Sequence, residues 1–243
     1  MKQQNCDIVI PLGSGSRFDN WELRMALRSI ERHIRHCGRI FIVSPQPPEW
    51  LCNVEVIIKG DPYKHNKDAN IIEKLLAAAA DERLSDDFIF WSDDQVALQD
   101  IDCRGLLPVY NSRCRDDFTG SNIWHQRMRN TFDYLAKHGR KLQWNWESHT
   151  PQKMNKTLFC QLMSSSDYRI APGLGVNTLY FGLLNTAPQL LQEHVKYTLE
   201  RAVTLEALPE DKLFSGYNDT ALQGNLPELL LQRFSQRSRF EKY

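Results

Sequence analysis

Residues 1–105 alternate short apolar runs with longer amphipathic segments, and this order restricts the fold more than any other feature of the sequence. The apolar runs, at residues 7–12, 39–43, 54–58 and 87–91, have the length of buried strands. Residues 20–36 repeat leucine and isoleucine at helical spacing, and residues 69–82 are rich in alanine. The order strand, helix, strand, strand, helix, strand predicts an α/β fold, with a mostly parallel, Rossmann-like sheet flanked by helices.

The remainder of the chain has weaker patterns. Residues 179–191 and 197–208 are predicted as helices, and residues 211–243 are polar enough to wrap the surface. No repeat, low-complexity tract or long linker interrupts the sequence, and 243 residues with 42% hydrophobic content can form one sizeable core. We therefore expect a single compact domain over residues 1–243.

Composition excludes some classes of function. Thirty basic residues balance thirty acidic ones, so no net charge attracts the chain to nucleic acid. The apolar run near the N-terminus is too short for a signal peptide, and no run of eighteen apolar residues predicts an integral membrane segment. The six cysteines form no CxxC pair, which favours reduced thiols over a zinc site or disulfides. We expect a cytoplasmic protein.

Two adjacent carboxylates, Asp93 and Asp94, directly follow the predicted strand at residues 87–91. In open α/β sheets, ligands bind at the carboxyl ends of the strands. Magnesium and manganese are commonly held there by one or two carboxylates together with substrate phosphates. The pair is therefore a candidate site for Mg²⁺ or Mn²⁺ with a diphosphate, although aspartates also simply form turns.

Other segments have two interpretations each. The turn Gly13–Ser16 follows the first predicted strand, where its N–H groups can bind a phosphate or merely close a turn. Trp124, Trp144 and Trp146 can form a platform for a sugar or a base, but tryptophan more often packs in a core.

The order of segments resembles the Stealth family of capsular and lysosomal sugar-1-phosphate transferases. The first two blocks are carried by Asp7–Val9, Ser14–Ser16, Glu22–Arg24, Leu27–Glu31, Ile40–Val43, Pro48–Leu51, Asn70, Ile72–Glu73, Leu84–Ser85, Phe88–Ile89 and Ser92–Asp94. The last two are carried by His149–Pro151, Met154, Lys156, Tyr168–Arg169, Tyr180–Phe181, Asn218–Asp219 and Ser238–Glu241. Ser92 stands where the family usually has asparagine.

This resemblance implies a GT-A-like fold and a set of site residues. The residues implied to surround the reacting diphosphate are Glu73, Asp94, His149, Arg169 and Asp219, with Asp93 beside them. Asp93, Asp94 and Asp219 would bind the metal, Arg169 the phosphate, and His149 would take a proton from the acceptor. Gly13, Ser14, Gly15, Ser16 and Arg24 would bind the donor. Without the resemblance, a structural histidine and a surface arginine and glutamate are the ordinary interpretations.

The resemblance therefore implies a metal-dependent transferase that moves a sugar 1-phosphate from a nucleotide-sugar, such as a UDP-sugar, to a hydroxyl acceptor such as a capsular or cell-surface glycan. Residues 1–105 would bind the nucleotide-sugar, and residues 106–243 would bind the acceptor and complete the site. Two alternatives stay open: a glycosyltransferase that moves only the sugar, and a non-catalytic nucleotide-sugar-binding protein. The oligomeric state is not predicted.

Overall fold

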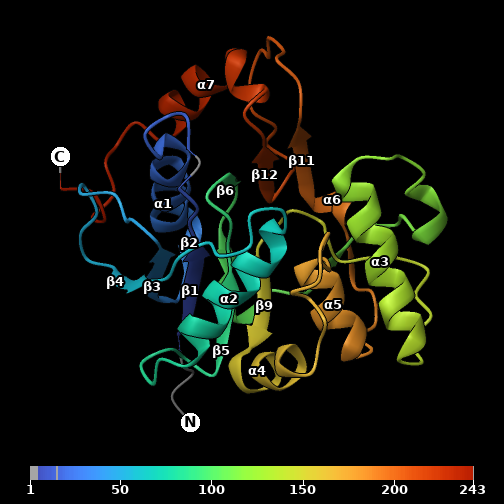
Figure 1. The fold of residues 1–243 in the computed structure, drawn as a ribbon. Coiled ribbons are helices and arrows are strands. Elements are labelled where there is room, and N and C mark those ends of the chain that lie inside the picture. Colours follow the sequence, from blue (N-terminus) through green and yellow to red (C-terminus); the bar gives the residue numbers. More distant parts are fainter. Residues whose placement is uncertain (1–4, 15, 243) are drawn as a thin grey trace.

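The central element of the structure, a computed structural model that describes residues 5–14 and 16–242, is a five-stranded sheet with the order β4-β3-β1-β5-β9 (Figure 1). The strands are β1 (Cys6–Pro11), β3 (Cys37–Ser44), β4 (Glu55–Ile58), β5 (Asp87–Phe90) and β9 (Gln152–Asn155). The first four strands of this order form three parallel pairs, and β9 pairs antiparallel with β5. The predicted α/β class and mostly parallel sheet are confirmed.

Helices cover both faces of this sheet, because alternate side chains of each strand point to opposite faces. Ile8 and Ile10 of β1 pack with Leu27 of helix α1 (Trp21–His33) in one buried cluster. Val9, between them, belongs to the cluster on the other face, where α2 (Lys67–Ala79), α4 (Lys156–Ser164) and α5 (Val176–Leu183) pack.

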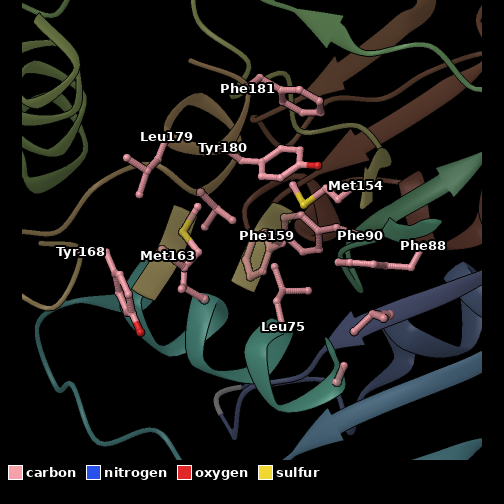
Figure 2. Packing of buried hydrophobic residues seen from close by; sticks show 14 of the residues in the cluster. Leu75, Phe88, Phe90, Met154, Phe159, Met163, Tyr168, Leu179, Tyr180 and Phe181 are labelled. Atoms are coloured by element: carbon pink, nitrogen blue, oxygen red, sulfur yellow. The ribbon is translucent and has the colours of Figure 1, made fainter. Parts of the chain in front are cut away.

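The larger cluster joins segments from both halves of the sequence. Figure 2 shows Phe88 and Phe90 of β5 beside Phe159 of α4, and Leu75 of α2 on the same side. Phe88 and Phe159 meet edge to face with ring centroids 6.3 Å apart, and both are fully buried. Burying a side chain of this size contributes about 1.5–3 kcal/mol, so this cluster holds α2 and α4 firmly on the sheet.

A second sheet of three strands, with the order β11-β12-β6, extends the fold beyond the carboxyl end of β5. Its strands are β6 (Gln95–Ala97), β11 (Lys196–Leu199) and β12 (Phe214–Tyr217). The prediction of a helix at residues 197–208 is wrong. Lys196–Leu199 is instead a strand that pairs in parallel with β12 and buries Leu199 in a third cluster with Tyr217.

The remaining elements are short or lie at the periphery (Figure 1). They are β2 (Ile34–Arg35), β7 (Ile101–Asp102), β8 (Val109–Tyr110), β10 (Leu190–Leu191), α3 (Ile123–Lys137), α6 (Gln192–Val195), α7 (Leu226–Arg233) and the 3-10 helices η1 (Cys103–Gly105), η2 (Arg115–Asp117) and η3 (Ala221–Gln223).

Several further predictions can be compared with the structure. The helix expected at residues 179–191 is α5, which begins at Val176 and ends at Leu183. The C-terminal segment contributes buried side chains, among them Phe214, Leu230 and Phe240, in addition to surface residues. All six cysteines are free thiols, and no helix in the described part of the chain is long and apolar enough to cross a bilayer.

Candidate active site

A cavity of about 870 Å³ opens at the carboxyl ends of β1 and β5. Its walls come from the loops after these strands, the N-terminal turns of α1, α2 and α5, and the ends of β11 and β12. Polar and charged residues make up most of the lining, including Glu22, Lys67, Asp68, Lys74, Asp93, Asp94, Arg127, Glu147, His149, Lys196, Tyr217 and Asp219. The cavity therefore lies where the parallel sheet predicts a ligand.

Four carboxylates gather at one end of the cavity, which we call the acidic end: Glu22, Asp93, Asp94 and Asp219. Burial, followed by repulsion from Asp94, raises the pKa of Asp93 to about 7. Burial raises the pKa of Glu22 as well, and Asp219 and Asp94 add to the effect. Placing these groups together is electrostatically costly unless a cation or a proton compensates them.

Asp94 and His149 form the closest ionisable pair at this end. The distance from His149 Nε2 to Asp94 Oδ1 is 2.8 Å. Burial alone acts to raise the pKa of Asp94, but attraction to His149, the hydrogen bond from it and nearby Lys67 outweigh burial and leave this pKa below its ordinary value. His149 also has a left-handed backbone with φ of 52°, an unfavourable conformation for a residue with a side chain.

Gly216 of β12 makes room for the imidazole ring. A Cβ atom placed at Gly216 would lie 3.0 Å from His149 Nδ1 and 2.9 Å from Lys196 Cε. A larger residue would therefore displace His149 or Lys196.

Lysines line the walls next to the acidic end. Lys74 Nζ binds Asp61 at 2.5 Å and the Leu12 carbonyl at 2.9 Å. Lys196 Nζ donates to the Ser148 carbonyl at 2.9 Å, and burial lowers the pKa of Lys196 to about 8. The cavity thus offers both carboxylates for a metal ion and ammonium groups for phosphate oxygens.

The turn after β1 lies between this cavity and a smaller one. Gly13, Ser14 and Ser16 line both, while Gly15 lies outside the described residues. Ser16 Oγ donates to Glu22 Oε2 at 3.1 Å, so the turn fixes a carboxylate of the acidic end. Arg24 lines only the smaller cavity, of about 440 Å³, where its guanidinium lies 3.9 Å from the centroid of the Trp50 ring.

Asp93, Asp94, His149 and Asp219 line the same cavity, although Asp219 is exposed and its carboxylate lies 3.9 Å from Arg17. Glu73 and Arg169 are not among the described residues that line the cavity, and they bind each other at 2.8 Å. The expectation that Glu73 and Arg169 lie in one site with Asp94 and His149 is therefore wrong. Successive residues of a helix are about 100° apart, so α2 turns Lys67 and Lys74 toward the cavity and Glu73 away from it.

The three tryptophans also lie in different parts of the structure. Trp124, on α3, lines the cavity. Trp146 is fully buried and packs in the large cluster, with Trp144 against it at a centroid distance of 6.2 Å. A shared aromatic platform is therefore absent among these three described residues.

Sequence reasoning missed many residues that line the cavity, among them Glu22, Lys67, Lys74, Glu147 and Tyr217. Lys67 and Lys74 carry a readable signal, because they are seven residues apart and therefore lie on one face of a helix that begins at Lys67 and follows a strand. Glu147 and Tyr217 carry no such signal, because long-range packing alone brings them here.

No group of three or more His, Cys, Asp or Glu side chains within residues 5–14 and 16–242 is arranged to hold a metal ion. The mutual repulsion of Asp93, Asp94 and Glu22 nevertheless fits a cation whose remaining ligands come from a substrate. No family model matches the chain, and no curated protein matches its sequence.

Proposed function

We propose that this protein is a metal-dependent transferase that moves a sugar 1-phosphate from a nucleotide-sugar, with a UDP-sugar as the first candidate, to a hydroxyl acceptor. The observation that carries the proposal is the Asp94–His149 pair, which lies at the strand end in a cavity that also contains Asp93 and Asp219. This combination serves proton transfer and metal-diphosphate binding at once. The sequence resemblance to the Stealth family supports the same reaction.

The metal ion in this proposal is Mg²⁺ or Mn²⁺. Asp93, Asp94 and Asp219 would hold it, with diphosphate oxygens as further ligands. When bound, the ion would withdraw charge from the phosphate that leaves. Lys67, whose charge acts on both Asp93 and Asp94, would neutralise phosphate oxygens at the same end of the cavity.

His149 is the proposed general base. In this role its Nε2, 2.8 Å from Asp94 Oδ1, would carry the hydrogen and donate it to the carboxylate, and Nδ1 would then keep the lone pair that accepts a proton. The acceptor hydroxyl gives its proton to Nδ1, and its oxygen forms a bond to the phosphorus that carries the sugar. The bond from this phosphorus to the bridging oxygen breaks, and a nucleoside monophosphate leaves with both bonding electrons.

A glycosyltransferase that moves only the sugar would use the same groups. Attack would then fall on the anomeric carbon, and a nucleoside diphosphate would leave. The mixture of carboxylates and lysines suits either reaction, so the identity of the released nucleotide decides between them.

The test is product analysis with purified protein, Mn²⁺ or Mg²⁺ and a panel of nucleotide-sugars. We expect a nucleoside monophosphate, and we expect Asp94→Asn to lower turnover by about 100-fold or more because it removes a ligand and a base partner. The matched control is Asp86→Asn, an exposed carboxylate next to the opposite end of β5. Release of a nucleoside diphosphate would favour the sugar-only reaction, and wild-type turnover by Asp94→Asn would contradict the mechanism.

A further inference from the structure

The strand β4 forms an open edge of the central sheet. No strand within residues 5–14 and 16–242 pairs with its outer side (Figure 1). On its inner side, the Lys59 N–H donates to the Ser44 carbonyl at 3.0 Å. Successive residues of a strand direct their backbone groups to alternate edges, so the N–H and C=O groups of Val56 and Ile58 point outward. A row of outward groups is a template for another strand.

This edge lacks the features that usually prevent strand addition. Those features include proline, lysine and bulges, whereas β4 has the sequence Glu-Val-Ile-Ile and an unbroken register with β3. Val56 is 43% exposed and Ile58 is 66% exposed. The strand at the opposite edge, β9, has the polar sequence Gln-Lys-Met-Asn and buries Gln152 and Met154. Of the two edges, β4 is therefore the one that offers apolar side chains to a partner.

The inward-facing backbone positions of β4 carry charges at both ends. Glu55 pairs with Arg83, and Lys59 Nζ lies 3.2 Å from Glu73 Oε2. The side chains of Glu55 and Lys59 are nevertheless 32% and 36% exposed, which leaves each able to meet a further opposite charge. Ile57, between them, packs against the cluster under α2. Along this face, the edge is negative, then apolar, then positive.

This order is complementary to itself in an antiparallel pairing. Consider a second copy of the chain related by a twofold axis that passes beside Ile57. Glu55 then lies opposite Lys59 of the second copy, and Val56 lies opposite Ile58. The outward groups of Val56 and Ile58 exchange hydrogen bonds as an antiparallel ladder requires. Opposite charges directly across two strands stabilise the pairing, and the twofold symmetry closes the assembly at a dimer.

The charges also select this register over its neighbours. An axis beside Ile58 would place Glu55 opposite Asp61 of the second copy, where like charges repel. An axis beside Val56 would place Glu55 opposite the apolar side chain of Ile57. An axis between two residues would pair outward backbone groups with inward ones. Only the register centred on Ile57 satisfies both the backbone and the charges.

We propose that the outer edge of β4 binds a second copy of this chain as an antiparallel strand centred on Ile57. The contact joins two five-stranded sheets into one continuous sheet. It is independent of the proposed reaction, because no residue of β4 belongs to the proposed transfer machinery.

The first experiment is sedimentation velocity of the full chain at low salt, from about 1 to 200 μM. We expect a monomer–dimer equilibrium. Glu55→Lys and Lys59→Glu should each weaken the dimer by about tenfold or more, because each places like charges at both symmetry-related pairs. The double variant should regain the wild-type dimer affinity to within about threefold. Glu228→Lys, the same change of charge on an exposed residue of α7, is the matched control and should dimerise as the wild type does.

Val56→Pro tests the backbone pairing. It removes an outward N–H and leaves the hydrogen bonds to β3 in place, and proline is tolerated on edge strands. We expect this variant to be monomeric over the whole concentration range, with the circular dichroism spectrum of the wild type.

Three results would each overturn the proposal. They are a wild type that stays monomeric, a double charge variant that dimerises no better than the single ones, and a Val56→Pro variant that dimerises like the wild type. A monomeric wild type that bound an unrelated β-strand peptide, and lost it with Val56→Pro, would assign the edge to a foreign strand in place of a second copy.

Discussion

Tyr217 is a buried residue whose hydroxyl has no hydrogen-bond partner within the described structure, although it lines the main cavity. Burial and the neighbouring carboxylates raise its pKa well above the ordinary value, so the hydroxyl keeps its proton and remains a donor. A phosphate or sugar oxygen that enters the acidic end would accept from it. The ring packs in the third cluster, whereas the unpaired hydroxyl adds nothing to the stability of the free protein.

This predicts opposite effects of Tyr217→Phe on stability and on binding. Stability should stay the same or rise by about 1 kcal/mol, because an unsatisfied polar group is removed. Affinity for UDP with Mn²⁺ should fall about tenfold. Urea unfolding and calorimetry measure the two effects, with Tyr197→Phe on the neighbouring strand as control. A stability loss above 1 kcal/mol without a change in affinity would show that the hydroxyl serves the fold.

Among single residues, the sequence correctly placed those that directly follow a buried strand. Asp93 and Asp94 follow β5 directly, and a buried strand delivers what comes after it to the ligand edge. Arg169 was assigned from a block resemblance alone, and the structure places it with Glu73 instead. Short-range patterns say nothing of which distant side chain a residue meets, so the partner of His149 needed coordinates.

At the scale of elements, the C-terminal segment locks α1 in place. Glu241 is buried and binds Arg28 through two contacts, Nε to Oε1 at 2.8 Å and Nη2 to Oε2 at 2.9 Å. It also accepts from Arg24 and from the N–H and hydroxyl of Ser238. Because α1 carries Glu22 into the cavity, this clamp stabilises one wall of the site from outside.

We predict that Glu241→Ala costs about 3 kcal/mol of stability at pH 7, since it removes the carboxylate that pairs with the largely shielded guanidinium of Arg28. Although burial acts to raise the pKa of Glu241, the hydrogen bonds from Arg28 and Ser238 outweigh it and lower this pKa to about 2. A carboxylate with a lowered pKa in the folded state stabilises above its unfolded pKa, and this contribution is lost as pH falls from about 4.5 toward 2.

The difference in free energy of unfolding between the wild type and Glu241→Ala should accordingly become smaller as the pH falls over that range. Urea unfolding at pH 7, 4 and 3 measures it, with Glu228→Gln, an exposed carboxylate of α7, as control. A difference that stayed constant down to pH 3 would contradict the role of charge and point to packing alone.

Elements were predicted well where one sequence run forms one buried strand. The apolar runs at β1, β3 and β5 face packed helices on both sides, so most of their residues are apolar. Such a run can be identified as a buried strand from the sequence alone. The strand β11 has the sequence Lys-Tyr-Thr-Leu and is defined by pairing with β12, some fifteen residues later. Its short, mixed pattern fits a helix equally well, and only the long-range pairing decides.

At the scale of the whole molecule, the acidic end of the cavity lies beside several lysines. Carboxylates gather at the acidic end, while Lys67, Lys74 and Lys196 line the adjoining walls. A cation alone finds fewer than the three close side-chain ligands that a preformed site needs among the described residues. A diphosphate alone meets the lysines but also the repulsion of Asp93 and Asp94. The diphosphate would therefore supply the ligands that the cation lacks, and the cation would offset the repulsion between the diphosphate and the two aspartates.

This arrangement predicts cooperative stabilisation by Mn²⁺ and UDP. A ligand at 100 times its Kd stabilises the folded state by about 2.7 kcal/mol, which raises the Tm of a chain this long by roughly 5–10 °C. We expect such a shift only when both are present, and shifts of about 1–2 °C with either alone. Asp93→Asn should weaken the joint effect and strengthen binding of UDP without metal, because it removes negative charge. An equal shift with Mn²⁺ alone would mean that the protein holds the ion by itself, and the diphosphate would then have no part in completing the site.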